Sequence, residues 1–561
     1  EERYRGRLAA ADCTAGVLRA ALDEYEEINR LMARPLAYAS LRFSADTTDP
    51  ARGALLQRMQ VESTAITRHL VFFDLEIGRM PAETFDRLIG DEAVAPYRHY
   101  LQRERQAARH HLSEPEEQIV QELGNTGVRA FNRLFSEITS RVTFRVRAHG
   151  EEKELNQSEV LALLYDPDRE LRKAAAAAIT ETLRQNAHVL TFIFNNLLLE
   201  KQTMDRLRRY DYAEQSRHED NELTPEIVQN VVDVCAASYD VVADYYGLKR
   251  RLLGIDELTH YDRYAPLTET GTEIPFGSAE EMVLGAFGEF SGPMREMTEP
   301  FFHRRWIDAE LRPGKRGGAF CSYITPDLHP FVFMNYTNKA RDVMTLAHEL
   351  GHAIHGVLAS RQNFLEFYPS LALAETASVF GEMLVFEKLQ AQLQDPREKL
   401  ALLCGKIEDS FATVYRQATM YRFEQAAHAA RRTEGELPTE RYNALWQNTM
   451  QEMFGDSLTL GEEHAWWWLY IPHIFASPFY VYAYSFGELL VMALYARYKQ
   501  EGEPFVQRYL DLLAAGGSRR PQDLLAELGI DITRKEFWQG GIDLIRGLVQ
   551  QANSLAEEVA G

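Results

Sequence analysis

The chain has 561 residues, of which 45% are hydrophobic and 26% are charged, which predicts a large core and more than one lobe. The 83 Asp and Glu residues outnumber the 61 Lys and Arg residues, so the formal net charge is −22 at pH 7. Such an acidic balance argues against nucleic acid and against anionic membranes as partners.

The four cysteines lie far apart in the sequence and form no CxxC pair; they are Cys13, Cys235, Cys321 and Cys404. A disulfide framework is therefore not expected, and a reducing, cytoplasmic location fits best. No apolar run reaches the length of a membrane span. The oligomeric state is left open by the sequence.

The first part of the chain, residues 1–160, is predicted to be an N-terminal helical cap region. Helices rich in Arg, Glu and Ala are expected over residues 14–32, 48–80 and 93–110, and the alternating residues 139–147 predict a short strand. This region has no metal-ligand pattern and no glycine-rich phosphate-binding signature. We therefore expect it to act as a scaffold or to shape a cleft.

The helical pattern continues beyond the cap region. Asp166-Pro167-Asp168 is typical of a helix start and leads into an alanine-rich run. Thr224-Pro225-Glu226 has the same character and introduces another apolar stretch. The further helices are expected over residues 168–178, 187–204, 227–252, 279–297, 388–457, 505–515, 521–529 and 535–557.

Residues 312–337 break this pattern, because they are glycine-rich and then extended. The composition of residues 330–337 is that of a strand, so a small sheet is expected just before the next helix. An exposed strand edge there could hold another extended chain by main-chain hydrogen bonds. Gly317-Gly318-Ala319-Phe320 would allow a second backbone to come close, although a simple turn explains the glycines equally well.

The next helix contains the pattern His-Glu-x-x-His, at His348, Glu349 and His352. Positions four apart share one helix face, so both imidazoles can reach one metal ion, with Glu349 placed to act as a base on a metal-bound water. A surface helix with two exposed histidines is the alternative. Gly351 argues against it, because a glycine inside a helix usually marks a close approach of another segment.

A catalytic zinc site takes three protein ligands and keeps one position for water. The pattern HExxHxxGxxH would supply a third histidine, but here its glycine position holds His355 and its last position holds Leu358. Residues 370–386 are instead predicted to form a buried helix with two acids, Glu375 and Glu382, on one face. We assign Glu375 as the third ligand and expect Glu382 to hold a ligand histidine by its other nitrogen. Exposed surface carboxylates are the alternative.

Together these residues resemble a known family of peptidases. The sequence His-Glu-Leu-Gly-His, followed by Ala-Glu375-Thr-Ala-Ser-Val-Phe-Gly-Glu382, is similar to the zinc oligopeptidases of the thimet oligopeptidase and oligoendopeptidase F family, with the second branch closer. The resemblance is strongest over residues 312–390 and 461–490. It implies a mainly α-helical, gluzincin-type fold with two helical lobes around a deep substrate channel, and a catalytic domain over residues 161–561. It also favours substrate binding for the glycine-rich segment.

An aromatic stretch near the end of the chain adds candidate hydrogen-bond donors. In the family that this chain resembles, a His followed about ten residues later by a Tyr stabilises negative charge on the carbonyl oxygen under attack. His473 matches that histidine, and Tyr482 is the best match for the tyrosine. Tyr480 and Tyr484 stay open as alternatives, because the segment before them departs from the thimet branch, where glycines precede the tyrosines.

The resemblance thus implies a zinc-dependent endopeptidase that cleaves short oligopeptides, with one Zn²⁺ per chain and peptide substrates as partners. A zinc carboxypeptidase or dipeptidyl carboxypeptidase of similar shape is an alternative, since Lys315, Arg316 and Lys339 near the motif could hold a terminal carboxylate. An inactive zinc-containing peptide-binding protein is another alternative. The presence of Glu349 argues against it.

Overall fold

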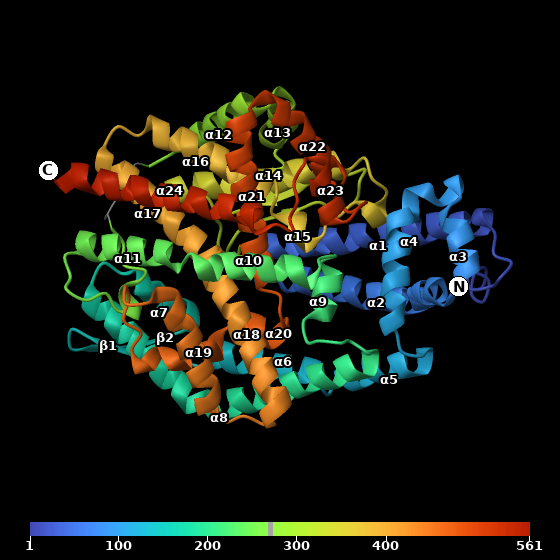
Figure 1. Cartoon of the computed structure of the whole chain (residues 1–561), viewed down its shortest axis with the longest axis horizontal. Helices are drawn as coiled ribbons and strands as arrows, with labels where there is room; N and C mark the ends of the chain where they lie inside the picture. Colours follow the sequence, from blue (N-terminus) through green and yellow to red (C-terminus); the bar gives the residue numbers. More distant parts are fainter. Residues whose placement is uncertain (268–272, 561) are drawn as a thin grey trace. The chain divides into compact units, whose positions relative to one another are not determined.

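The computed structural model describes residues 1–267 and 273–560, and the chain is mainly α-helical as expected (Figure 1). It forms two compact units, each built from three separated segments of the sequence. Unit 1 comprises Glu1–His111, Thr272–Gln392 and Leu494–Asp531, and unit 2 comprises Leu112–Gly271, Leu393–Ala493 and Ile532–Gly561. This interleaving was not expected. The division into a cap region, residues 1–160, and a catalytic domain, residues 161–561, stays a prediction.

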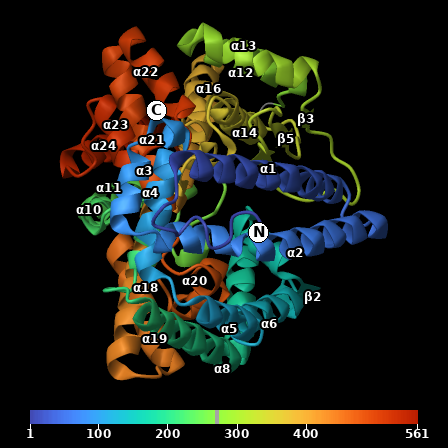
Figure 2. The ribbon, with the colours of Figure 1, turned by 90° about the vertical axis from the view of Figure 1, so that its right-hand side faces the viewer.

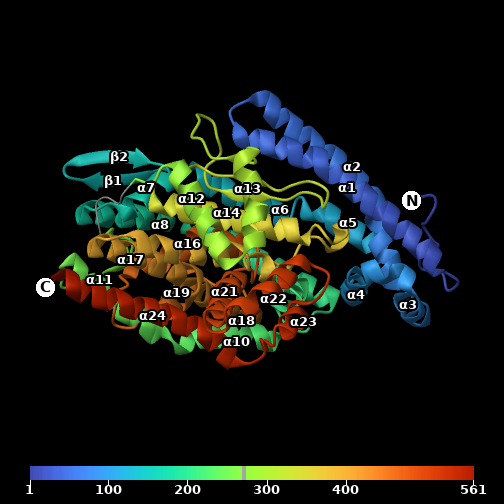
Figure 3. The same cartoon turned by 90° about the horizontal axis from the view of Figure 1, so that it is seen from above.

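Unit 1 begins with two long antiparallel helices, α1 and α2, which lie side by side in Figures 1 and 3. Asp49 caps α2 by accepting a hydrogen bond from the Ala51 amide, directly before Pro50 at the first helical position. The helices of unit 1 are α1 (Ala15–Ala45), α2 (Pro50–Arg79), α3 (Ala82–Ile89), α4 (Arg98–Ala107), α12 (Phe276–Phe290), α13 (Gly292–His303), α14 (Ala340–Ala359), α15 (Leu371–Ala374), α16 (Ser378–Gln392), α22 (Glu503–Ala514) and α23 (Pro521–Glu527).

A three-stranded sheet precedes α14, which confirms the small sheet predicted there. Its strands are β3 (Ile307–Asp308), β4 (Phe320–Ser322) and β5 (Phe331–Phe333), in the order β3-β5-β4. β5 pairs in parallel with β3 and antiparallel with β4, so β4 is an edge strand. Figure 2 shows β3 and β5 beside α14.

The core of unit 1 joins α12, α16 and α22 through contacts between aromatic rings. Phe380 packs against Phe290 and Tyr509 with ring centroids 5.0 and 4.4 Å apart. These contacts fix α16 against its neighbours, and α14 packs along the same helix.

Unit 2 contains the long helix α8, which Asp168 caps as its sequence indicates. Two separate helices were expected here. One helix forms because the intervening residues 178–187 contain neither glycine nor proline. The helices of unit 2 are α5 (Glu114–Gly124), α6 (Val128–Arg141), α7 (Gln157–Ala162), α8 (Arg169–Arg208), α9 (Gln215–Asp220), α10 (Pro225–Ala237), α11 (Tyr239–Leu253), α17 (Pro396–Thr413), α18 (Tyr415–Glu434), α19 (Thr439–Phe454), α20 (Pro472–Ala476) and α24 (Lys535–Ala560).

The strand predicted within residues 139–147 begins later than expected, at β1 (Phe144–Ala148). It pairs with β2 (Glu151–Leu155) in an antiparallel hairpin, which Figure 3 shows beside α7 and α8. Helix α21 (Tyr482–Glu501) has residues in both units. The four cysteines are free thiols. No helix in the described part of the chain has the length and apolar character needed to cross a membrane.

Candidate metal centre

Helix α14 presents the His-Glu-x-x-His residues from a well-defined start. Asp342 in its first turn accepts hydrogen bonds from the backbone amides of Thr337 and Lys339, at 2.6 and 3.0 Å. These bonds satisfy amides at the helix entrance that have no partner within the helix. The apolar face of α14, including Val343 and Leu346, is completely buried, so the helix is held firmly in unit 1.

Three predicted ligands meet in space. The Oε2 atom of Glu375 lies 3.4 Å from Nε2 of His348 and 3.5 Å from Nε2 of His352. All three candidate ligand atoms lie within 4.8 Å of one another. Ligands about 2.0–2.2 Å from a tetrahedral zinc ion are separated by ~3.3–3.6 Å, so these side chains fit such an ion.

The far side of each imidazole is also held. His348 Nδ1 lies 3.4 Å from Glu382 Oε2, and a hydrogen bond links His352 to the backbone of Ala374. Such contacts orient the ring so that the other nitrogen faces the metal. Burial alone would lower the pKa of His348, but the hydrogen bond to Glu382 and the charges of Glu375 and Glu382 raise it to about 9. The two carboxylates thus favour positive charge at this place, which a divalent cation would supply.

The segment that carries Glu375 is not the single helix predicted over residues 370–386. It breaks into α15 and α16, and Glu375 stands in the turn between them. Ser378, at the start of α16, donates a 2.7 Å hydrogen bond to Glu375 Oε2 and holds the carboxylate in place. Nothing in the sequence singled out Ser378, although a serine three residues after an acid is a common partner for it.

Gly351 allows this turn to approach the zinc helix. A Cβ atom at Gly351 would lie 2.3 Å from the carbonyl oxygen of Ala377 and 2.6 Å from Cα of Ser378, which is far inside van der Waals contact. The close approach expected from the glycine is therefore present. It brings the Glu375 turn onto the helix that carries the two histidines.

Glu349 follows His348 directly and is 6% exposed. Burial raises its pKa to about 7, against the opposing effects of His348 and of a hydrogen bond from the backbone of Cys321 on β4. A carboxylate with this affinity for a proton can both accept and return one near neutral pH. The contact also places Glu349 next to the edge strand, a neighbour that the sequence did not reveal.

The glycine-rich segment leads into that edge strand. Gly318 has φ +83°, and a Cβ at Gly317 or Gly318 would meet no atom within 4 Å. Asn335 fixes the segment by donating hydrogen bonds to the Arg316 and Gly318 carbonyls, at 2.9 and 3.0 Å. Ala319 precedes β4, and Phe320 opens it and stacks on Phe333 with centroids 4.7 Å apart. β4 pairs with β5 on one side only, so it is an edge strand of this sheet, and its Cys321 backbone contacts Glu349.

The group around His473 lies in unit 2. The Nε2 atom of His473 lies 3.4 Å from the Tyr484 hydroxyl, and the ring of Tyr480 is parallel to the imidazole with centroids 6.2 Å apart. The two tyrosine rings contact edge to face, 5.2 Å between centroids. The Arg217 guanidinium, which the sequence did not single out, lies over the Tyr480 ring at 5.8 Å.

Tyr482, the preferred tyrosine from the sequence, has a different environment. Its side chain is completely buried, and its hydroxyl accepts a 2.7 Å hydrogen bond from Asn221. Its ring packs on Tyr421 and His218. Of the three candidates, Tyr480 and Tyr484 lie next to His473 in the structure. Their positions are four apart and share one side of the chain, whereas Tyr482 points to another side.

The chain is similar to known proteins over most of its length. The family model described as peptidase family M3 matches residues 162–544, and the one described as oligopeptidase F matches residues 76–144. Oligopeptidase PepF of Bacillus subtilis is 27% identical over 546 residues, which are 95% of this chain and 80% of that protein. A solved structure from Chlamydophila abortus, 23% identical, covers 98% of this chain and 92% of its own with a TM-score of 0.88. Oligoendopeptidase F of Enterococcus faecium, 22% identical, covers 100% and 96% with a TM-score of 0.74.

Proposed function

The chain belongs to peptidase family M3 and is a metalloendopeptidase, and from this premise we propose that it hydrolyses internal bonds of short oligopeptides with one Zn²⁺ held by His348, His352 and Glu375. The observation that carries the proposal is the meeting of three ligand atoms from two segments, with Glu349 one residue from the first ligand. The oligopeptidase names of the relatives support short peptides as substrates. The free cysteines support a reducing, cytoplasmic location.

The chemistry divides between the ion and the side chains. When bound, zinc would supply Lewis-acid polarisation of a water molecule and of the scissile carbonyl. Glu349 then accepts the proton of the attacking water and delivers it to the leaving amine, a role that its buried position and raised pKa support. Glu382 keeps the His348 ring in orientation throughout.

The peptide itself needs a backbone partner and a donor for its carbonyl oxygen. We assign the first role to the edge strand β4, with Gly317 and Gly318 leaving room for the substrate backbone. We assign the second to Tyr484 with His473, whose polar tips lie together. Tyr480 supports both rings, and Tyr482 belongs to the core of unit 2.

The decisive variant is Glu349→Gln. It should bind zinc like the wild type, measured as metal content after dialysis, and cleave peptides at least ~100-fold more slowly, because only the base is removed. Glu387→Gln is the matched control, because it makes the same change at a carboxylate that pairs with Lys499 and is not a ligand. Undiminished hydrolysis by Glu349→Gln would rule out this mechanism.

Cleavage-site mapping on a peptide library tests the type of peptidase. Internal cleavage of peptides blocked at both ends, abolished by a chelator and restored by Zn²⁺, is the expected result. Release of one or two residues from free C-termini alone would instead identify a carboxypeptidase or a dipeptidyl carboxypeptidase.

A further inference from the structure

A cavity of about 180 Å³ lies within unit 2, against the His473 side chain. One part of its wall is apolar, with Met420, Trp446 and Met450. The other part is polar and includes two guanidinium groups, those of Arg263 and Arg416. Apart from His473, none of these residues was singled out by the sequence, and the proposed chemistry does not use the arginines.

The two arginines meet at one hydroxyl group. Arg263 and Arg416 each donate a hydrogen bond to the Tyr264 hydroxyl, at 2.6 and 2.7 Å. Arg263 is only 7% exposed. Within residues 1–267 and 273–560, no carboxylate forms an ion pair with either guanidinium, and the Nε atom of each is buried without a hydrogen-bond partner. Two like charges therefore stand together, and no carboxylate of the described residues forms an ion pair with them.

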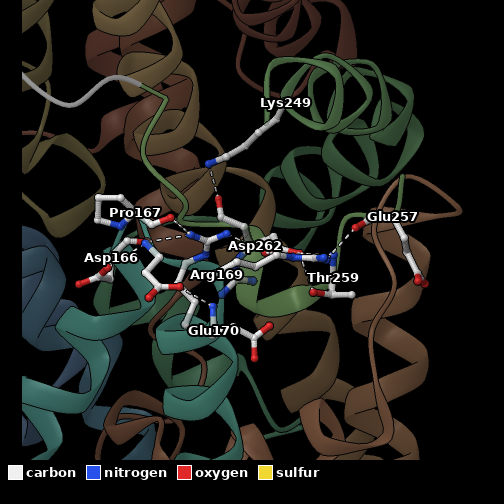
Figure 4. A network of polar contacts seen from close by, with 11 residues as sticks. Asp166, Pro167, Arg169, Glu170, Lys249, Glu257, Thr259 and Asp262 are labelled. Atoms are coloured by element: carbon white, nitrogen blue, oxygen red, sulfur yellow. Dashed lines mark hydrogen bonds and ion pairs between the residues drawn. The ribbon is translucent and has the colours of Figure 1, made fainter. Parts of the chain in front are cut away.

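Two carboxylates in this part of unit 2 pair with other cations. Asp262, completely buried, accepts hydrogen bonds from Arg169 and Arg172, as Figure 4 shows for Arg169. Glu408 pairs with the buried Lys249, whose amino group also donates to the backbone carbonyl of Arg263. Three other cations thus pair with these two carboxylates, and neither carboxylate forms an ion pair with Arg263 or Arg416.

Tyr264 cannot balance the pair alone. Burial would raise the pKa of its hydroxyl, but Arg263 and Arg416 hold that pKa below its ordinary value. Even a fully ionised Tyr264 supplies one negative charge for two guanidiniums. A buried, unpaired charge is costly to a fold, so a further anion in the cavity would lower the free energy of this arrangement.

We propose that this cavity binds a carboxylate carried by an apolar group, with Arg263 and Arg416 as its charge partners. Guanidinium groups match carboxylates in geometry, and the apolar wall would receive the group that carries the carboxylate. The carboxylate comes from the C-terminal residue of a bound peptide or from a free organic acid. The first source rests on the proposed function, because the cavity borders His473, which is assigned to the substrate carbonyl.

The experiment compares two peptides of one sequence that end in the same apolar residue, one as free acid and one as amide. With zinc-loaded wild type we expect kcat/KM to be about 10-fold or more higher for the acid, expressed mainly in KM. Arg416→Gln should bring the ratio of kcat/KM for the acid to that for the amide to about one. Arg416→Lys keeps the charge but not the paired N–H donors of the guanidinium, so it should give an intermediate ratio. Arg422→Gln is the matched control, because Arg422 lies on the same helix and pairs with Glu452 at 2.7 Å.

A second arm measures binding without turnover. Sodium acetate should raise the thermal midpoint of the wild type above its value in sodium chloride of equal ionic strength, and should not do so for Arg416→Gln. An acetate effect without any preference for the free acid supports the site and identifies a free organic acid as its ligand. If the wild type shows neither the preference nor the acetate effect, the proposal is overturned. If neither peptide is cleaved at all, the proposed function fails, and the acetate arm still decides on the cavity.

Discussion

His348 is held between two carboxylates, with its Nδ1 atom 3.4 Å from Glu382 and its Nε2 atom 3.4 Å from Glu375. Only the second contact belongs to the metal-binding side of the ring. Glu382 therefore orients the His348 ring without being a metal ligand, so its effect can be tested while all three ligands stay in place.

The first prediction concerns Glu382. Replacing it with Gln leaves the three ligands in place but weakens the acceptor for His348 Nδ1, so zinc affinity should fall about 10- to 100-fold. Titration of the apoprotein against a zinc-buffering chelator measures this change, and excess zinc should restore most of the activity. Glu387→Gln, on the same helix but paired with Lys499 at the surface, should leave the affinity unchanged. Equal affinities of Glu382→Gln and wild type would show that Glu382 does not orient the ring.

Gly351 gives a second prediction. Gly351→Ala should destabilise the protein by about 1–3 kcal/mol or more and reduce zinc affinity, because the new methyl group would push the Ala377 carbonyl and the Glu375 turn away from α14. Gly247→Ala is the control within a helix, since its Cβ would meet no atom within 4 Å. That variant should be stabilised by about 0.5–1 kcal/mol. Thermal midpoints and zinc titrations of the two variants test both statements, and a neutral Gly351→Ala would refute the close packing.

The sequence predicts the metal centre better than its surroundings. Helical spacing places His348 and His352 on one face, and two acids in an apolar segment direct attention to Glu375 and Glu382. The break between α15 and α16 could not be predicted, because it accompanies a contact with Gly351 from another helix. The interleaving of the two units is equally hidden, since apolar patterns show which faces are buried but not which distant segments bury them.

The sequence could not decide among the three tyrosines for the same reason, because it does not show which distant segments they contact. Periodicity places Tyr480 and Tyr484 together but does not tell which side faces His473. Tyr482 lies on the other side because its hydroxyl meets Asn221, which is 261 positions away in the chain. Long-range partners of this kind decide which polar tip is available for chemistry, and no local pattern contains them.

The third prediction separates these tyrosines. Tyr484→Phe should lower kcat about 100-fold or more while the thermal midpoint changes little, because it removes a donor to the developing negative charge. Tyr482→Phe should instead lower stability by about 1–3 kcal/mol, since completely buried Asn221 loses its partner, and should change kcat much less. Steady-state kinetics and thermal unfolding of the two variants give the comparison. A large loss of kcat in Tyr482→Phe but not in Tyr484→Phe would instead identify Tyr482 as the donor to the developing negative charge.

The last prediction is a pH dependence of stability at Glu424 on α18. This side chain is completely buried, and one carboxyl oxygen accepts a 2.8 Å hydrogen bond from the Phe479 amide, where φ is +58°. Burial raises its pKa from 4.5 to about 8, so the folded protein holds a proton that the unfolded chain releases. The stability that this group contributes is therefore fully present below the unfolded pKa. It falls by up to about 1.4 kcal/mol per pH unit as the pH rises from the unfolded pKa to the folded pKa.

Glu424→Gln keeps an acceptor for Phe479 and cannot ionise, so its stability relative to wild type should increase between about pH 5 and about pH 8. Urea unfolding midpoints across this interval measure the effect, and the exposed Glu440→Gln on α19 should show no such trend. A difference between Glu424→Gln and wild type that stays constant with pH would mean that Glu424 ionises in the folded protein at its ordinary pKa.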